Sequence, residues 1–152
     1  MNLQESFKAT GDVYIKVYDK DGKLKEAHAF KNRVVTTGKY YIANRLAGVS
    51  TGTVPVVGWM SIGTGNTTPA DGDTNLVTHA YRVALDSLTA TTTSNTVTAV
   101  ATFPAGSGTG AVTEAGIFNA SSGGTMLCRT TFSAVNKASG DSIAITWVVT
   151  VS

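Results

Sequence analysis

The stretch TVTAVATF, residues 96–103, decides the fold class of this chain of 152 residues. Val97, Ala99, Ala101 and Phe103 fall on one side of an extended chain, and mostly threonine falls on the other side. A period of two residues is typical of a β-strand with one face against a core and one face toward solvent. Threonine suits the outer face because it is β-branched and also offers a hydroxyl group to water.

The same alternation recurs along most of the chain. Further strands are predicted at residues 12–18, 24–30, 56–62, 81–88, 112–118, 126–132 and 143–151. Polar loops, without helices, separate most of these strands, which indicates antiparallel sheets packed face to face. We therefore predict an all-β fold, an antiparallel, jelly-roll-like β-sandwich. The threonines predicted on its outer faces are Thr98, Thr102, Thr131, Thr146 and Thr150.

One short helix is predicted at about residues 38–47. Thr36 or Thr37 would cap its start, and Gly48 stands where a helix usually stops. The apolar stripe of this helix consists of Ile42, Ala43, Leu46 and Ala47. Because three turns are not stable alone in water, the helix is expected to pack across the mouth or edge of the sheets.

The length fits one domain. Residues 1–10 are predicted to form an N-terminal arm, and residues 11–152 a single β-sandwich domain that includes a hairpin at 12–31 and the helix. Hydrophobic residues make up 42% of the chain and charged residues 14%, which argues against disorder.

The charges are unevenly distributed. Residues 1–45 hold nine of the twelve Lys and Arg residues and five of the ten acidic residues, so the remainder of the chain is mildly acidic. Acidic residues interleave with the basic ones in the hairpin, which is typical of a protected sheet edge and not of a nucleic-acid interface. No apolar run approaches the roughly 20 residues of a membrane span. We therefore expect neither nucleic acid nor membrane as a partner.

No catalytic, cofactor-binding or metal-binding residues are predicted, and the chain is not expected to be an enzyme. The two histidines, His28 and His79, have no further ligands or catalytic partners clustered around them in the sequence. A single cysteine, Cys128, excludes intrachain disulfides and is expected in the core or the sheet. No signal peptide is visible, so synthesis in a reducing cytoplasm is expected. Asp71 and Asp73 are expected in a solvated turn, and whether they bind an ion stays open.

Glu114 is a lone acid in an otherwise apolar strand. A buried carboxylate needs a partner, and Arg129 or Arg82 on neighbouring strands could form a cross-strand ion pair with it. A structural pair is expected here, because no second carboxylate or histidine lies nearby in the sequence.

Three segments together resemble small structural proteins of tailed bacteriophages. These are residues 30–46, with Asn-Arg-Val-Val-Thr-Thr-Gly (residues 32–38) before a helix, residues 60–70, with Ile-Gly-Thr-Gly, and residues 113–119, with Glu-x-Gly-hydrophobic-Phe. The resemblance spans roughly residues 30–151. It implies a non-enzymatic building block of the virion, made in the host cytoplasm, with Gly63 and Gly65 as turn residues.

The resemblance implies first a capsid cement or decoration protein that stabilises the phage head. Its expected partners are the major capsid protein or other virion subunits, and the chain is expected to form a homo-oligomer. The first strand and the N-terminal segment are expected to contact the capsid or a sister chain. The alternatives are a tail, baseplate or fibre subunit and a carbohydrate-binding β-sandwich, the latter assisted by calcium at Asp71 and Asp73.

Overall fold

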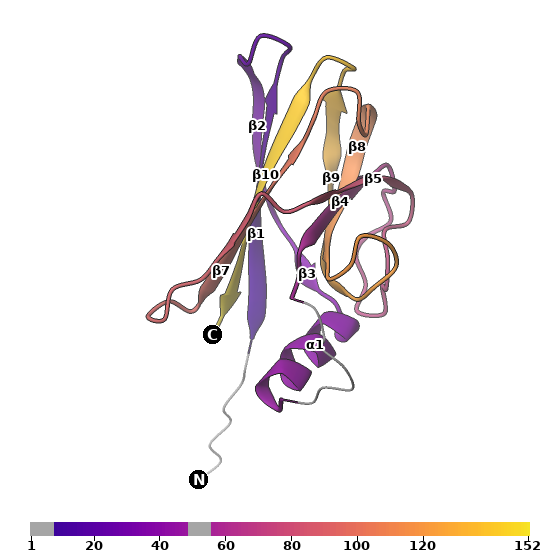
Figure 1. Ribbon diagram of the computed structural model, residues 1–152. Helices are drawn as coiled ribbons and strands as arrows, with labels where there is room; N and C mark the ends of the chain where they lie inside the picture. Colours follow the sequence, from indigo (N-terminus) through magenta and orange to yellow (C-terminus); the bar gives the residue numbers. More distant parts are fainter. Residues whose placement is uncertain (1–7, 49–55) are drawn as a thin grey trace.

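The chain folds into two five-stranded antiparallel sheets packed face to face (Figure 1). The structure is a computed structural model, and it describes residues 8–48 and 56–152. In spatial order, the first sheet contains β2 (Leu24–Lys31), β1 (Ala9–Tyr18), β10 (Ser142–Val151), β7 (Thr96–Phe103) and β6 (Ser87–Thr89). The second contains β3 (Arg33–Val34), β9 (Met126–Lys137), β8 (Gly110–Phe118), β4 (Trp59–Gly63) and β5 (His79–Ala84). The predicted all-β antiparallel sandwich is confirmed.

The core lies between the sheets and follows the predicted alternation. In the first sheet, Val13 lies opposite Trp147 and Ile15 opposite Ile145, and all four are buried. The second sheet contributes buried side chains from its own inward positions: Met60, Ile62, Ala115, Ile117, Cys128 and Val135. Trp147 is the largest fully buried side chain. The strand at residues 96–103 lies where the alternation predicts it, with Ala99, Ala101 and Phe103 buried and Thr102 exposed.

The predicted strand at residues 81–88 is wrong, because this segment is divided between the two sheets. The backbone N–H of Leu85 donates to the carbonyl of Gly58, 2.9 Å away, while the N–H of Asp86 donates to Val100 in the first sheet, 2.7 Å away. The chain therefore crosses from one sheet to the other at residues 85–86. The alternation of apolar and polar residues holds as far as Asp86 and changes phase at Ser87 and Leu88, and the prediction of one continuous strand overlooked this change.

The helix α1 (Thr36–Leu46) starts two residues earlier than predicted, and no threonine caps it. Val35 is the N-cap residue, and no side chain completes the cap. Val35 is fully buried in a small apolar cluster with Phe118 and Met126 of the second sheet. This packing holds the residue directly before the helix in place. The threonines instead join α1 to its surroundings, since the Thr37 hydroxyl donates to the Met126 carbonyl (3.1 Å) and the Thr36 N–H to the Asp71 carbonyl (2.8 Å). Gly48 follows the helix with φ of +60°, as a helix end favours.

The predicted apolar stripe of α1 does not form a buried face. Ile42 is half-buried, but Ala43 and Ala47 are exposed, and Leu46 has an exposed fraction of 79%. The buried residue of the helix is Gly38, which approaches β9 so closely that a Cβ atom there would overlap the Leu127 carbonyl oxygen. The helix crosses one end of the sandwich, as predicted (Figure 1), and it packs on β9, where Gly38 lies against Leu127.

The hairpin of β1 and β2 belongs to the first sheet and carries the predicted mixture of charges. Lys31 pairs with Asp12, and Lys20 with Asp21 at 3.0 Å. Ala9 and Thr10, which fall in the predicted arm, already belong to β1, while residues 1–7 lie outside the described residues. None of the helices described in residues 8–48 and 56–152 has the length and hydropathy that a membrane span requires.

Gly38→Ala should destabilise the fold by about 1–3 kcal/mol, since the added methyl group must displace α1 from β9. Chemical denaturation followed by circular dichroism measures the change in the free energy of unfolding. Gly72→Ala is the matched control, because a Cβ at Gly72 meets no atom within 4 Å. Equal stabilities of the two variants would contradict the close packing of α1 on β9.

Candidate functional site

The outer face of the second sheet carries a buried ion pair between β8 and β9. The side chains of Glu114 and Arg129 are both 0% exposed, and Arg129 reaches the Glu114 carboxylate with Nη2 at 2.9 Å and Nε at 3.0 Å. Arg129 also pairs with Asp73 through Nη1 at 2.8 Å. We call Glu114, Arg129 and Asp73 the Glu114 cluster. The predicted partner Arg129 is confirmed.

The Glu114 cluster fixes the segment of residues 64–78, which covers this face of the sheet. The backbone N–H groups of Gly65 (3.0 Å), Val77 (3.0 Å) and Thr78 (2.7 Å) donate to the Glu114 carboxylate. Arg129 Nη2 also donates to the Thr67 carbonyl at 3.0 Å. One buried carboxylate and one guanidinium thus hold both ends and the middle of a fifteen-residue segment.

The chemical state of Glu114 suits a structural anchor. Burial by itself raises the pKa of this carboxyl group, but the backbone donors of Thr78 and Val77, the Arg129 guanidinium and the Gly65 N–H together lower the pKa below its ordinary value. The carboxylate is therefore charged at neutral pH and surrounded by donors. Such a group is poorly suited to accept a proton from a substrate.

Gly63 and Gly65 lie beside the cluster for a different reason from the one predicted. Neither has a positive φ, so a turn does not require glycine at these positions. A Cβ atom at either residue would lie 2.6 Å from Glu114 Oε1. The glycines are needed because the backbone passes directly over the carboxylate.

Arg82, the other predicted partner of Glu114, has a different role. Its guanidinium carbon lies 3.7 Å from the centre of the Phe118 ring, and its Nη1 donates to the carbonyls of Ala120 (3.0 Å) and Gly123 (3.1 Å). Burial lowers the pKa of this guanidinium. Arg82 therefore fixes the loop between β8 and β9.

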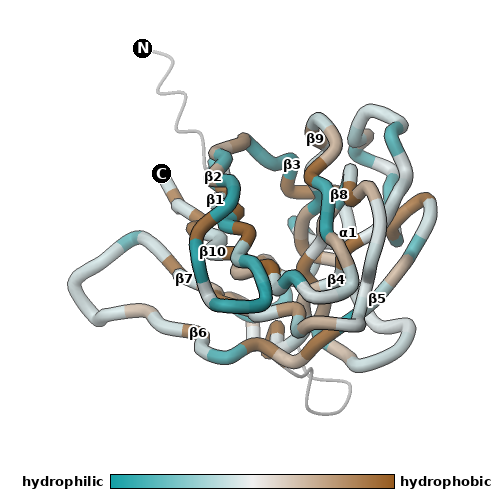
Figure 2. Tube along the Cα trace, turned by 90° about the horizontal axis from the view of Figure 1, so that it is seen from above, coloured by the Kyte–Doolittle hydropathy of each residue, from teal (hydrophilic) through white to brown (hydrophobic). Residues whose placement is uncertain are grey.

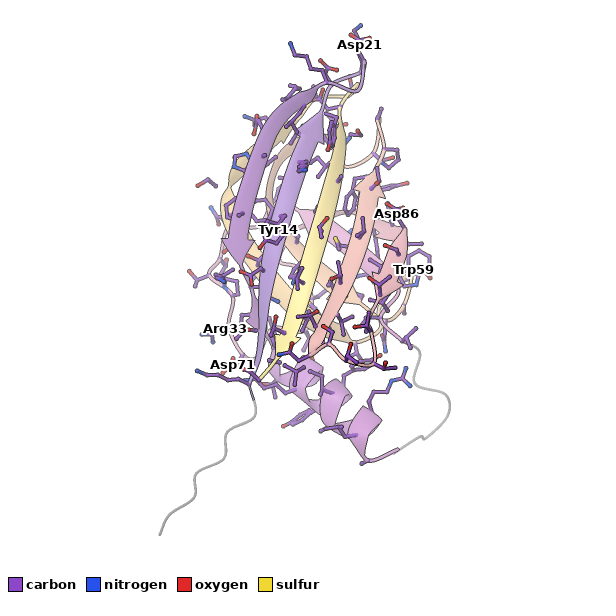
Figure 3. The ribbon with its side chains drawn as sticks, turned by 90° about the vertical axis from the view of Figure 1, so that its left-hand side faces the viewer. Tyr14, Asp21, Arg33, Trp59, Asp71 and Asp86 are labelled. Carbon is purple, nitrogen blue, oxygen red and sulfur yellow. The ribbon has the colours of Figure 1, made fainter. Side chains whose placement is uncertain are left out.

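The two aspartates of the predicted turn face cations of the protein. Asp71 lies 3.1 Å from Arg33 and 3.7 Å from Lys39, and Figure 3 shows Arg33 and Asp71 side by side near the start of α1. Asp73 belongs to the Glu114 cluster. Within residues 8–48 and 56–152, no three His, Cys, Asp or Glu side chains gather in a way that could hold a metal ion.

The remaining candidate residues lie apart. His28 is on the edge strand β2, where it bonds Glu26 at 2.9 Å, whereas His79 is exposed at the start of β5 in the other sheet. Cys128 is fully buried in the core, and burial raises the pKa of its thiol to about 12. The thiol is therefore protonated and shielded from reagents.

The outer face of the first sheet is nearly free of charge over β10 and β7. No charged residue occurs between Ser87 and Thr113. Thr98, Thr146 and Thr150 are half-buried there, in agreement with the predicted threonine-lined face. In Figure 3 this sheet faces the viewer, with Tyr14 on β1 and Asp86 at the opposite margin.

A groove of about 390 Å³ lies between α1 and the open end of the sandwich, and we call it the α1 groove. Its lining is almost wholly apolar, from α1 (Tyr41, Ile42, Leu46), the segment before β4 (Val56, Val57) and both sheets (Leu88, Val97, Ala99, Ile117, Leu127, Val149, Val151), with Arg45 beside them. Sequence reasoning missed this groove, because it assigned the apolar helix residues to a buried contact. Two sequence features point to the groove. Val56, with an exposed fraction of 62%, is the first residue of one predicted strand, and Leu88 is the last residue of another, so each places an apolar side chain at the end of a strand.

Residues 33–148, well over half of the chain, match the family described as "Podophage GP4 fiber I protein gp80". No curated protein and no solved structure matches the chain. The matched region runs from β3 into β10 and contains the whole Glu114 cluster.

Glu114→Gln should destabilise the protein by about 3–5 kcal/mol at pH 7, because it leaves the Arg129 charge buried without its main counter-charge. Urea denaturation measures this loss. Asp71→Asn, which alters a carboxylate that is more than half exposed, should cost less than about 1 kcal/mol. If Glu114→Gln proves as mild as Asp71→Asn, the cluster does not anchor the segment of residues 64–78.

The stability difference between the wild-type protein and Glu114→Gln should depend on pH. A carboxyl group with a lowered pKa in the folded state stabilises fully above the pKa of the unfolded chain, about 4.3, and this stabilisation is lost as the pH falls through the folded-state pKa. The difference should therefore be constant from pH 7 to about 5 and shrink below about 4. Denaturation curves at several pH values test this, and parallel pH profiles would contradict it.

Proposed function

The chain belongs to the family of podophage GP4 fiber I protein gp80, and we propose that it is a structural subunit of a tail-associated fibre. The family match is the observation that carries this proposal. At the coarser level, membership of this family makes the chain a structural protein of a phage virion. The sequence predicts a capsid cement protein first, but the description of the family favours the fibre alternative.

The fold is suited to a non-enzymatic building block. The Glu114 cluster and Arg82 each use charge to fix a loop onto the second sheet, so the long segment of residues 64–78 keeps one shape. A subunit that must present the same contact surfaces in every copy benefits from such rigidity, because less conformational entropy is lost on assembly.

Two surfaces are available for contacts with neighbouring virion subunits. The threonine-lined face of the first sheet carries little charge, and the centres of protein interfaces are typically depleted of charge. The α1 groove adds an apolar surface at one end of the sandwich. Both features support assembly into a larger particle and do not distinguish a fibre from a head.

The carbohydrate-binding alternative draws less support. Asp71 and Asp73, its proposed calcium ligands, are paired with Arg33 and Arg129 instead. The most exposed tyrosines are on β1 and α1 and not on loops, where stacking on a sugar is expected.

Cryo-electron microscopy of the virions that carry this chain should reveal the sandwich at the tail, and quantitative mass spectrometry should find far fewer copies than of the major capsid protein. The capsid protein in the same particles is the internal standard. Copies in the hundreds, distributed over the head surface, would overturn the fibre assignment in favour of the cement function.

A further inference from the structure

The α1 groove presents an apolar surface at one end of the sandwich, with a rim that is much more exposed than its floor. Its floor contains Ala99, Ile117 and Leu127, which are core residues of both sheets, and its rim contains Leu46 and Val56. Apolar surface of this kind is costly in water. A volume of about 390 Å³ leaves room for more than one large apolar side chain.

The N-terminal segment starts beside this groove. Lys8 and Ser152 exchange two backbone hydrogen bonds, of 2.5 and 2.8 Å, and Val149 and Val151 of the same strand line the groove. Lys8 also lines a second hollow on the other side of α1. Residues 1–7, if extended, reach up to about 24 Å, which exceeds the length of about 16 Å of the eleven-residue helix. The segment can therefore span the groove.

The composition of residues 1–7, MNLQESF, complements the groove. Leu3, Glu5 and Phe7 share one face of an extended chain, with the acidic residue between two apolar ones. The groove offers an apolar floor and the Arg45 side chain, which lies against the Tyr41 ring. Glu5 is also the sole charged side chain of the segment.

We propose that residues 1–7 of a second copy of this chain occupy the α1 groove, with Leu3 and Phe7 against its apolar floor and Glu5 beside Arg45. A second copy is favoured over the same copy for two reasons. Lys8 continues the ladder of β1 with β10 to Ser152, so an extended chain would run on past the end of the sheet, and residues 1–7 contain neither glycine nor proline to reverse it. The inference goes beyond the proposed function, because it would hold for a fibre or a head protein.

Analytical ultracentrifugation of the full chain tests the association. The wild-type protein should self-associate, and Leu46→Arg or deletion of residues 2–7 should raise the dissociation constant at least about tenfold. Leu46 is 79% exposed, so the melting temperature of Leu46→Arg should match that of the wild type. Leu24→Arg is the control. Leu24 is exposed on the edge strand β2 and does not line the α1 groove, so this variant should leave association unchanged. A monomeric wild-type protein, or variants that associate as the wild type does, would overturn the proposal.

The charge pair offers a second test. Glu5→Arg should weaken association, and adding Arg45→Glu should restore it, which a general loss of stability would not do. Failure of the double variant to recover association would count against the predicted contact of Glu5 with Arg45 and hence against the seating of the segment.

Cysteine cross-linking distinguishes a second copy from the same copy. Leu3→Cys and Leu46→Cys are made in separate chains and mixed under oxidising conditions, and the buried Cys128 should not react. A disulfide between the two chains supports the proposal. If only a chain carrying both cysteines cross-links, within itself, the groove takes its own segment and the proposal is wrong. Absence of any cross-link also overturns it.

Discussion

The buried pair of Glu114 and Arg129 is the interaction on which the second sheet depends. The segment of residues 64–78 has little apolar surface of its own to bury, with Leu76 as its buried large side chain. Hydrophobic packing therefore cannot hold it. The Glu114 carboxylate does so by accepting three backbone N–H groups and the Arg129 guanidinium. Removal of either partner would leave an uncompensated charge in the interior, which is far more costly than the net gain from the pair.

Exposed ion pairs act differently in this molecule. Lys20 with Asp21 and Lys31 with Asp12 are accessible to water on the β1–β2 hairpin and contribute little to stability. They do, however, keep the edge strand β2 charged, which discourages pairing with another strand. The opposite edge of the same sheet, at β6, lacks charged residues, and Figure 2 shows pale, weakly polar chain between β6 and β7. The first sheet thus has one protected edge and one uncharged edge.

The sequence predicted those features that one strand determines by itself. Alternation in β1, β7 and β10 predicted their buried faces, and a lone acid in β8 predicted an ion pair. It could not choose between Arg82 and Arg129, because strand register depends on the loop between β8 and β9 and on a bulge near Ile117. The crossover at residues 85–86 is marked in the sequence only by a change of phase at Ser87 and Leu88, which is too short to distinguish a change of sheet from the end of a strand.

The apolar stripe of α1 shows why a pattern alone cannot locate an interface. Ile42 and Leu46 have the spacing of residues that face a core, and the sequence places a core nearby. Gly38, however, brings the first turn of α1 against β9, and the last turn then stands away from the sheets. The stripe consequently faces a groove.

The two candidate contact surfaces differ in how they interact with water. The threonine-lined face of the first sheet can remain hydrated in an isolated chain because its hydroxyl groups form hydrogen bonds with water, whereas the α1 groove offers water few hydrogen-bonding groups. We therefore expect the groove to supply most of the free energy of association, and the uncharged sheet face to permit close approach of neighbouring subunits.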